Sequence, residues 1–491
     1  MKKPFTLVAL LTGFAMLALF CSSARAQTLA FDPTFGTAGL ATTVMSSGAV
    51  DDIPHAVHMQ PDGKIVVGGV CGVQFCVARY LANGTLDPSF GAVGTPGKAL
   101  LSRLGEDRAY ATALQPDGKI VMAGDCRIPL GINIGFCIVR LTANGLPDST
   151  FGAGGWVEVP MASGYDGARA IAIQPDGKLV VSGDCSEAPT FVRSFCHVRL
   201  LPNGALDTTF NTTGKAYTPY TGSGLSGNHK FVTASAIRSD GMIFVVGYSE
   251  TASVDRILVL RLTPAGTAGF WHAIDFDAVG DDRAFGVAVQ ASGRVLVSGE
   301  CGMRSCMLRL NADDSGLDTN YGTSGKLLVE DASVTGERVG AVTLFPDGSS
   351  LFAGWSNPTG GICNGTVRRV SSGGDRQGGV TVGGCTPMRA ITSQLDLKPV
   401  VVHDCFGSGT QRDFCVYRYQ APPTEFRNCS LDVDGDGKVI ATTDTLIAAR
   451  VALGFTGAAV LNGVTFETHA LRKTWPDIRS WMINHCAIPL L

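Results

Sequence analysis

The chain of 491 residues has few charged side chains and little of what long helices require. Charged residues make up 16%, against roughly a quarter in an average globular chain, and the helix formers Lys and Glu are scarce. A formal net charge of −3 argues against nucleic acid as the main partner, because that role needs a basic surface. Hydrophobic residues at 45% exclude a disordered polymer. The 62 glycines, with many Val and Thr residues, favour short strands and tight turns.

Long apolar runs are missing except at the start of the chain. An apolar stretch at 5–20 follows two lysines, and Ala24-Arg25-Ala26 supplies a small-x-small cleavage pattern. Residues 1–26 are therefore predicted to be a secretory signal peptide, since the stretch is too short for a good membrane anchor. Cys21 raises the alternative of a lipoprotein, but Phe20 stands where that signal needs a small residue. No other stretch predicts a transmembrane segment in the mature chain.

Export would place the mature chain in the extracellular space or at the cell surface, with the periplasm as the alternative. These compartments are oxidising and allow disulfides. One of the 15 cysteines, Cys21, lies in the signal segment, so an even number remains after cleavage. An even number in an exported chain predicts a framework of disulfide bonds.

Residues 27–421 contain seven copies of a repeat of roughly 55 residues. Its first phrase is Gln-Pro-Asp-Gly-Lys followed by a β-branched run, as in Gln60–Gly69, and the turn positions stand at 62, 117, 176, 240, 292, 347 and 396. A second phrase carries an arginine. A third reads D-x-x-F-G at 32, 87 and 148, with the variants DTTFN at 207 and DTNYG at 318. A fixed period of this kind indicates one supersecondary unit per repeat.

Each phrase has a physical interpretation. Pro-Asp-Gly fits a tight hairpin turn, because Pro fixes φ at the first corner and Gly accepts a positive φ. The β-branched run, the segment before the turn, the segment ending in the arginine and a fourth stretch such as 39–45 give four strands per repeat. Seven such units predict a mainly β fold, a seven-bladed β-propeller. A solenoid is the alternative, but no polar caps are evident at the ends.

The two ends of the repeat array are out of phase in a way that favours ring closure. The chain enters with a D-x-x-F-G phrase and the strand near 39–45, before the first hairpin turn. It leaves after Tyr417-Arg418-Tyr419, where the next fourth strand is due. The N-terminal strand is therefore predicted to complete the last blade, which removes two open sheet edges. The D-x-x-F-G and Q-x-D-G-K phrases resemble the delta-60 repeat, a bacterial propeller-forming repeat without an agreed activity.

The cysteines follow the repeat. Five pairs bracket the same connection, between the β-branched strand and the strand ending in the arginine: Cys71/Cys76, Cys126/Cys137, Cys185/Cys196, Cys301/Cys306 and Cys405/Cys415. If the two cysteines face each other at a non-hydrogen-bonded position of an antiparallel pair, their Cα atoms are about 4.5 Å apart, within disulfide range. We expect five disulfides within hairpins. Cys363 and Cys385 remain, and the sequence does not decide whether they pair with each other. Zinc binding is the rival interpretation, but no histidine pattern accompanies the cysteines.

The arginine of the second phrase recurs at 79, 140, 199, 261, 309, 368 and 418. Seven equivalent positions in a ring favour a structural ion pair over a ligand site. The Asp of the D-x-x-F-G phrase is the expected partner, with Asp107, Asp166 and Asp282 as alternatives.

Beyond a linker at Ala421-Pro422-Pro423 the composition changes, and 422–491 is predicted to be a separate domain. Its loop carries oxygen ligands at alternating positions, which suits one structural Ca²⁺ ion. The proposed metal ligands are the carboxylates of Asp432, Asp434 and Asp436, the backbone carbonyl of Lys438, and Asp444 at the start of a helix.

This loop resembles the first calcium loop of a dockerin, and the resemblance implies a small helical module and a cohesin-like partner. There are departures: Asp444 falls at position 13 of the loop, where a dockerin has its acid at 12, and residues 456–475 contain no second D-x-D-x-D loop. A second helix is expected at Pro476–Cys486, and Cys429 is expected to pair with Cys486. A solvated acidic turn is the alternative interpretation.

Enzyme motifs are missing: H-E-x-x-H, G-x-S-x-G and a phosphate-binding loop do not occur. His55 and His58 lie in a strand-like stretch, where residues three apart face opposite sides, so they are a poor chelating pair. No catalytic residue is therefore assigned. The favoured hypothesis is a secreted binding or scaffolding propeller whose ligand is a polysaccharide or another surface protein. The alternative is a polysaccharide-degrading hydrolase or lyase with its active site on the propeller axis, an analogy taken from the enzymes that dockerins accompany.

Overall fold

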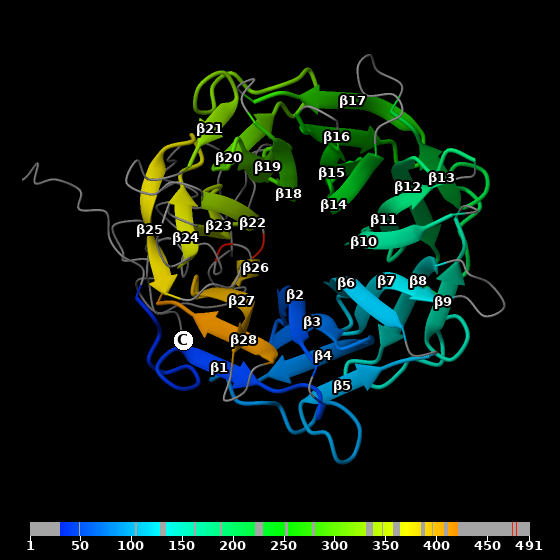
Figure 1. The fold of residues 1–491 in the computed structure, drawn as a ribbon, viewed down its shortest axis with the longest axis vertical. Coiled ribbons are helices and arrows are strands. Elements are labelled where there is room, and N and C mark those ends of the chain that lie inside the picture. The colour runs from blue at the N-terminus through cyan, green and yellow to red at the C-terminus, as the bar shows by residue number, and fades with distance from the viewer. Residues whose placement is uncertain are drawn as a thin grey trace, which may run out of the picture.

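The chain forms a ring of seven four-stranded antiparallel sheets around a central axis (Figure 1). The computed structural model describes residues 30–420 together with Thr474 and Ile478, with gaps at 49, 104–105, 128–133, 162–163, 187–188, 221–228, 251–253, 277–279, 330–336, 346, 357–363, 384–387, 395 and 407–410. Within 30–420 all the regular structure is β, and the predicted seven-bladed propeller is confirmed.

Each blade is a meander whose first strand lies nearest the axis. Blades one to three are β2(Asp52–Met59), β3(Ile65–Cys71), β4(Gln74–Tyr80), β5(Lys98–Leu101); β6(Asp107–Leu114), β7(Ile120–Arg127), β8(Ile134–Leu141), β9(Trp156–Val159); and β10(Asp166–Ile173), β11(Leu179–Ser186), β12(Arg193–Leu200), β13(Lys215–Thr218).

Blades four to seven continue the ring in order. They are β14(His229–Ile237), β15(Ile243–Glu250), β16(Arg256–Leu262), β17(Ala268–Ile274); β18(Asp282–Val289), β19(Val295–Cys301), β20(Arg304–Leu310), β21(Lys326–Leu328); β22(Glu337–Leu344), β23(Ser350–Ser356), β24(Asn364–Val370), β25(Arg376–Gly383); and β26(Met388–Ser393), β27(Pro399–Phe406), β28(Arg412–Arg418) with β1(Leu40–Thr43).

The Pro-Asp-Gly phrase makes the turn between the first and second strands of a blade. In blade one the amide of Gln60 donates to the carbonyl of Lys64 (2.8 Å), and the amide of Gly63 donates to the carbonyl of Gln60 (2.9 Å). Gly63 has a φ of 83°, which explains why the phrase ends in glycine. The carboxylate of Asp62 accepts from the amide of Lys64 (3.2 Å) and closes the turn.

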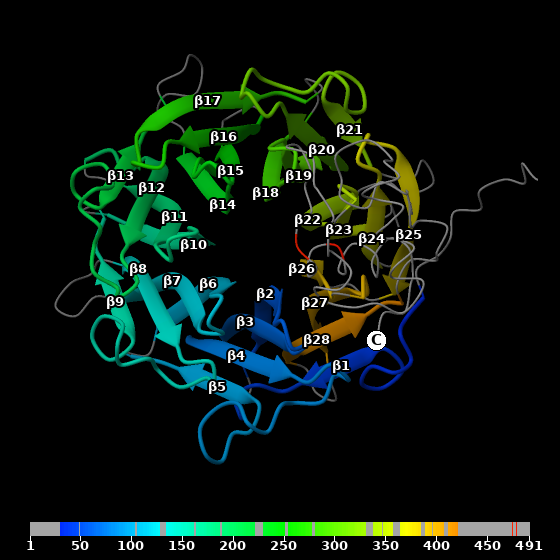
Figure 2. The same cartoon turned by 180° about the vertical axis from the view of Figure 1, so that it is seen from behind.

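The N-terminal strand closes the ring, as the phase of the repeats predicts. β1 is the outer strand of blade seven and pairs antiparallel with β28, with Leu40 opposite Tyr417 and Thr43 opposite Phe414. In both views β1 lies against β28, and blade one follows directly (Figures 1 and 2). One edge of the array thereby covers the other.

The hydrophobic core is divided into clusters that are shared by neighbouring blades. At the closure, Val400 and Val402 of β27 pack in one cluster with Ile65 and Val67 of β3, and all four side chains are fully buried. Successive strands of a blade therefore present apolar side chains to both neighbours, which explains the continuous β-branched run in each second strand. Ring closure completes the burial of the first and last blades.

Among the described residues, the recurrent arginine bonds to the next blade in six of the seven blades. In blade four, which has no D-x-x-F-G phrase, Arg261 pairs with Asp314 of blade five instead. In blade two, Nε of Arg140 donates to Asp148 of the D-x-x-F-G phrase (2.8 Å), Nη2 donates to Thr150 (3.0 Å), and the guanidinium lies 4.6 Å from the ring centre of Phe151. Its Nη1 donates to the carbonyl of Pro202 in blade three. We call this arrangement the latch. Equivalent ion pairs are Arg79–Asp87, Arg199–Asp207, Arg309–Asp318 and Arg418–Asp32.

The structure corrects two predictions about this arginine: its position in blade six and its alternative partners. In blade six the latch arginine is Arg369, which lies opposite Leu351 as Arg79 lies opposite Val66; the prediction of Arg368 was wrong by one residue. Spacing misled because the described residues of blade six contain no D-x-x-F-G phrase, and Arg369 pairs with Asp347 of its own turn (2.9 Å). The alternative acceptors accept backbone amides instead, as Asp107 does from Arg103 (2.6 Å).

All five predicted hairpin disulfides are present, with Cα–Cα distances from 5.7 to 6.0 Å. The expectation that the paired cysteines face each other directly was wrong, because they are offset by two residues. In blade one, Cys76 lies opposite Gly69, while Cys71 lies opposite Gln74. The twist of the strands brings one diagonal pair within bonding distance. These disulfides are compatible with an extracellular location.

The pairs Cys363–Cys385 and Cys429–Cys486, the linker and the C-terminal calcium loop lie outside the described residues. Beyond 420 the structure shows one hydrogen bond, from the amide of Ile478 to the carbonyl of Thr474 (3.1 Å). In the described part of the chain, no helix has the length and apolar character needed to cross a membrane.

Candidate binding site at the axial channel

Every innermost strand carries a β-bulge at the same position. In β2 the register jumps between Pro54 and Ala56, so His55 has no partner on β3. The other six strands repeat this jump. The seven bulged residues are His55, Tyr110, Arg169, Thr233, Phe285, Gly340 and Arg389, and each is partly exposed whereas the residue before it is buried. A bulge redirects a side chain, and here it places all seven around one channel.

The glycine that ends the first phrase explains the bulge. The strand backbone at the bulge approaches this glycine so closely that a Cβ on Gly69 would overlap the carbonyl oxygen of Ile53. A Cβ on Gly124 or Gly183 would overlap a carbonyl oxygen in the same way. In six blades a glycine on the second strand makes room for the bulge. Blade seven forms the same bulge opposite His403. The sequence contained this signal, but the motif was interpreted only as part of a strand.

The bulged residues line a cavity of about 440 Å³ on the axis, with walls from all seven innermost strands. These strands surround the centre of the ring in both views (Figures 1 and 2). The residue after each bulge is small in every blade: Ala56, Ala111, Ala170, Ala234, Gly286, Ala341 and Ala390. The remaining lining includes the aliphatic Val57, Ile171 and Val287 together with the polar Thr112 and Ser235. We call the end of the channel that the seven bulged residues form the mouth; it is chemically varied.

Arg169 is held rigidly at this mouth. Its Nε donates to Asp184 (3.3 Å), its Nη2 donates to the hydroxyl of Tyr165 (2.5 Å), and its guanidinium stacks 4.0 Å from the ring centre of Tyr110. The hydroxyl of Tyr165 in turn donates to Asp125 (2.8 Å). Burial raises the pKa of Asp184, although the neighbouring guanidiniums act in the opposite direction.

His55 lies beside Tyr110, with ring centres 5.6 Å apart. Burial lowers the pKa of His55 to about 3, and the positive charges of Arg389 and Arg169 act in the same direction. His55 is therefore neutral at physiological pH. His58 points to the next blade, where its Nε2 lies 2.7 Å from the carbonyl oxygen of Thr112. The two histidines thus have separate roles and do not form a chelating pair.

A larger cavity of about 1080 Å³ lies at the other end of the blades. Its lining includes turn residues such as Pro61, Gly63 and Gly348, and also the latch residue Arg418. These residues recur in the repeat because the turn and the latch need them. We therefore place the candidate site at the smaller cavity, where equivalent positions carry different chemistry in different blades.

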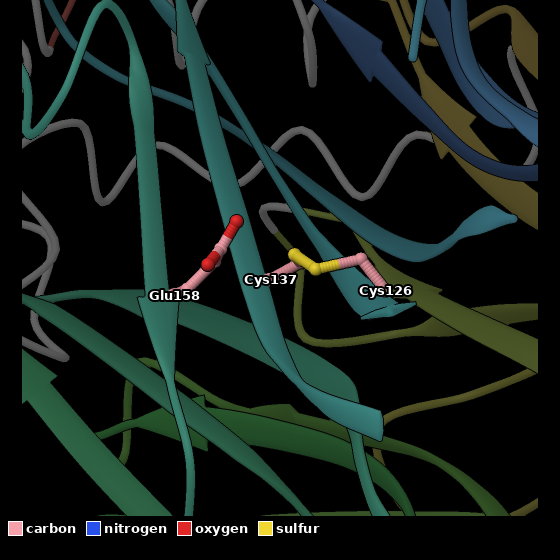
Figure 3. Close-up of side chains that lie close together, drawn as sticks. All are labelled: Cys126, Cys137 and Glu158. Carbon is pink, nitrogen blue, oxygen red and sulfur yellow. A yellow bond between two sulfur atoms is a disulfide. The ribbon is translucent and has the colours of Figure 1, made fainter. Parts of the chain in front are cut away.

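Cys126, Cys137 and Glu158 lie close together in blade two (Figure 3). The two sulfur atoms are joined in a disulfide, so neither is a thiolate that could bind zinc. Glu158 forms an ion pair with Arg103. This cluster is therefore structural. The predicted calcium ligands, Asp432, Asp434, Asp436, Lys438 and Asp444, lie outside the described residues, so the structure does not place them.

Comparison with known proteins gives the same class of fold. The family described as a domain of unknown function (DUF5122) beta-propeller matches 60–90, 115–151, 174–210 and 238–268, which fall in blades one to four. The chain is a β-propeller repeat protein. No curated protein matches its sequence.

Solved structures resemble the chain only in fold. Virginiamycin B lyase from Staphylococcus aureus is 10% identical, and the match covers 77% of this chain and 98% of that one with a TM-score of 0.46. A protein of unknown function from Bacteroides caccae is 13% identical over 65% and 93% of the two chains (TM-score 0.37). Sqt1 of Chaetomium thermophilum is 10% identical over 76% and 96% (TM-score 0.44).

Proposed function

We propose that the protein is a secreted binding propeller that holds its ligand at the mouth of the axial channel. The ligand is a polysaccharide or another protein of the extracellular surface. One observation supports this proposal above all others. The seven bulged positions share one backbone geometry but carry His, Tyr, Arg, Thr, Phe, Gly and Arg, while the next residue is Ala or Gly in every blade. A purely structural position would repeat its residue, as the latch does.

The mouth has the composition of a recognition site. Pockets for small ligands combine apolar and aromatic walls with a few fixed polar groups. Here Phe285 and Tyr110 supply aromatic surface, and Arg169 is held in place by its partners. The neutral His55 adds ring nitrogens that donate or accept hydrogen bonds.

The proposal is tested with a glycan array and with hydrolysis assays on the mature chain. We expect binding without turnover, and a loss of at least tenfold in affinity for Phe285→Ala, because Phe285 lines the cavity. Phe406→Ala is the matched control, since Phe406 is 61% exposed and does not line the cavity. Equal losses in both variants would contradict a site in the channel. Release of sugars would instead support the alternative, a hydrolase or lyase.

We also propose that the C-terminal module binds one structural calcium ion and attaches the protein to a cohesin-like partner. The support is the spacing of Asp432, Asp434 and Asp436, which suits a calcium loop. Calorimetry on the mature chain should detect one calcium ion, lost in Asp434→Asn. The control is Asp313→Asn, an exposed acidic residue of blade five. No binding heat in the wild-type chain would show that the loop is only a solvated acidic turn.

A further inference from the structure

Blade three carries a trio of charged side chains at the channel mouth. Asp184 is fully buried and accepts from Nε of Arg169 on one oxygen (3.3 Å) and from Nη1 of Arg193 on the other (3.0 Å). Two cations therefore share one carboxylate. The guanidinium of Arg193 also lies 4.2 Å from the ring centre of Tyr165, which fixes its position. The trio leaves one positive charge that no anion of the trio balances.

Blade seven carries the same trio. Asp404 is fully buried and accepts from Nε of Arg389 (2.6 Å) and from Nη1 of Arg412 (3.0 Å). In the described part of the chain, Arg389 has no hydrogen-bond partner besides Asp404, and it lines the cavity. Asp51 lies 4.0 Å from Arg412, but Asp51 is half exposed, so solvent screens its charge.

The two trios occupy equivalent positions in their blades. Arg169 and Arg389 are the bulged residues, Asp184 and Asp404 precede the second-strand cysteine, and both outer arginines begin the third strand. The other blades have a different residue at the bulge. Blades three and seven are three steps apart around the ring, so their innermost strands, β10 and β26, face each other across the axis (Figures 1 and 2).

We infer that the two trios make the channel mouth a receptor for an acidic oligosaccharide, whose carboxylates bind the guanidiniums of Arg169 and Arg389. The inference rests on the proposed function and names the ligand class of that site. Each buried aspartate uses Nε of its inner arginine and thereby orients the rest of the guanidinium. A guanidinium fixed in this way is suited to bidentate recognition of a planar carboxylate.

Two further features favour a sugar acid over other anions. Phe285 lines the same cavity as the two arginines and offers an apolar ring surface that suits the face of a pyranose ring. The positive charges also act within the site: burial lowers the pKa of His55 most, and Arg389 and Arg169 lower it further, whereas the charge of Asp404 acts in the opposite direction. A neutral imidazole leaves hydrogen-bonding capacity for hydroxyl groups next to a carboxylate.

The test compares trigalacturonate with its fully methyl-esterified form, which has the same rings but no charge. Calorimetry on the mature chain should show binding of the acid, weakened by added salt, and at least tenfold weaker binding of the ester. Arg389→Gln should reduce affinity for the acid at least tenfold, and Arg389→Lys should fall between, since it keeps the charge but loses the planar fork. Arg256→Gln is the control, because Arg256 pairs with Asp275 and does not line the cavity.

The outcomes separate this inference from the proposed function. Equal affinity for acid and ester, or unchanged affinity of both Arg389 variants whose melting curves are native, would overturn the anionic site. If Phe285→Ala still abolished binding of a neutral glycan, the channel would remain the binding site. Tighter binding of a polyglutamate peptide than of trigalacturonate would overturn the ligand class. If neither saccharides nor peptides bound, the proposed function itself would fail.

Discussion

Two sets of arginines in this propeller show what separates a structural group from a binding group. Arg140 of the latch is 5% exposed, and Asp148, Thr150 and the carbonyl of Pro202 use its hydrogen-bond donors. Arg389 at the channel mouth is 25% exposed and bonds to one shared carboxylate. The recurrence of the latch arginine in the sequence predicts its structural role, but nothing in the sequence marks Arg389 as a binding residue. The difference follows from the number of acceptors around each guanidinium and from whether the site opens to solvent.

Position in the repeat accounts for this difference. The latch arginine and its aspartate belong to the same phrase pattern, so their partner comes with the repeat. The arginines at the mouth stand at the bulge, where each blade has a residue of its own. Repeated positions hold the ring together, while the varied position is available for a ligand.

The largest effect is expected from removing the segment that closes the ring. Deletion of residues 28–46 removes β1 and also Asp32, the latch partner of Arg418. The edge of β28 becomes exposed and Arg418 loses its carboxylate, so we expect aggregation or loss of the cooperative thermal transition. Scattering and calorimetric melting measure both. A deletion variant that stays monomeric and melts like the full mature chain would contradict closure by β1.

The next effect concerns the latch itself. Arg140→Ala leaves the buried Asp148 with Lys119, at 3.4 Å, as its remaining cation, beside the hydrogen bonds from the amide and hydroxyl of Thr150. Breaking a buried ion pair from one side costs about 3 kcal/mol or more of unfolding free energy, and urea unfolding measures it. The matched variant Arg389→Gln should cost less, because Arg389 is more exposed and Arg412 still pairs with Asp404. Equal losses of unfolding free energy in the two variants would contradict the conclusion that the latch arginine is structural and Arg389 is not.

A smaller effect is expected for a disulfide at the mouth end. The two cysteines of the Cys405–Cys415 bond are 10 residues apart in the sequence, so the bond closes a short loop. Replacing both with serine should lower the free energy of unfolding by about 2–3 kcal/mol. Because Cys405 follows Asp404, this variant should also weaken ligand binding, whereas Arg140→Ala should leave affinity unchanged in the folded fraction. Urea unfolding and binding calorimetry on the same samples measure the effects on stability and on ligand affinity separately. Unchanged affinity in the cysteine variant would show that the disulfide does not hold the mouth.

The smallest effect is a difference in acid sensitivity between the two regions. Burial acts to raise the pKa of Asp148, but Thr150, Arg140 and Lys119 outweigh it and lower the pKa to about 2. The stability that Asp148 contributes is therefore present above its ordinary pKa of 3.8 and is lost as the pH falls towards 2. For His55, with a pKa of about 3, the unfolded state takes up the proton first, so stability falls between pH 6.5 and 3.

His55→Gln should therefore reduce the loss of stability between about pH 6.5 and 4. Asp148→Asn should lower stability at neutral pH by breaking the latch ion pair, but should alter the pH dependence only below about pH 4. Urea midpoints measured across this range separate the two windows. Identical pH profiles for His55→Gln and the wild type would contradict a buried neutral imidazole at the mouth.

Much of the fold follows from the sequence because its signals are local and repeated. The Pro-Asp-Gly turn, the β-branched strand and the arginine with its D-x-x-F-G aspartate lie within one repeat, and each is repeated with little change in the first three blades. Seven turns predict seven blades, and the phase of the ends predicts closure through 39–45. The same local logic failed at Arg368, where the repeat decays and only strand register identifies Arg369 as the latch residue.

The candidate site could not be predicted in the same way. The glycines at the end of the first phrase, such as Gly69, mark the bulge, but the bulge is a relation between two strands and becomes visible only when they pair. The diagonal pairing of the cysteines likewise depends on twist and register. The sequence by itself determined the repeat unit, the number of blades and the five pairs of cysteines within hairpins. Only the tertiary structure decided that Arg169 and Arg389, far apart in the chain, face each other across one channel, because closing the ring is what brings blades three and seven to opposite sides of the axis.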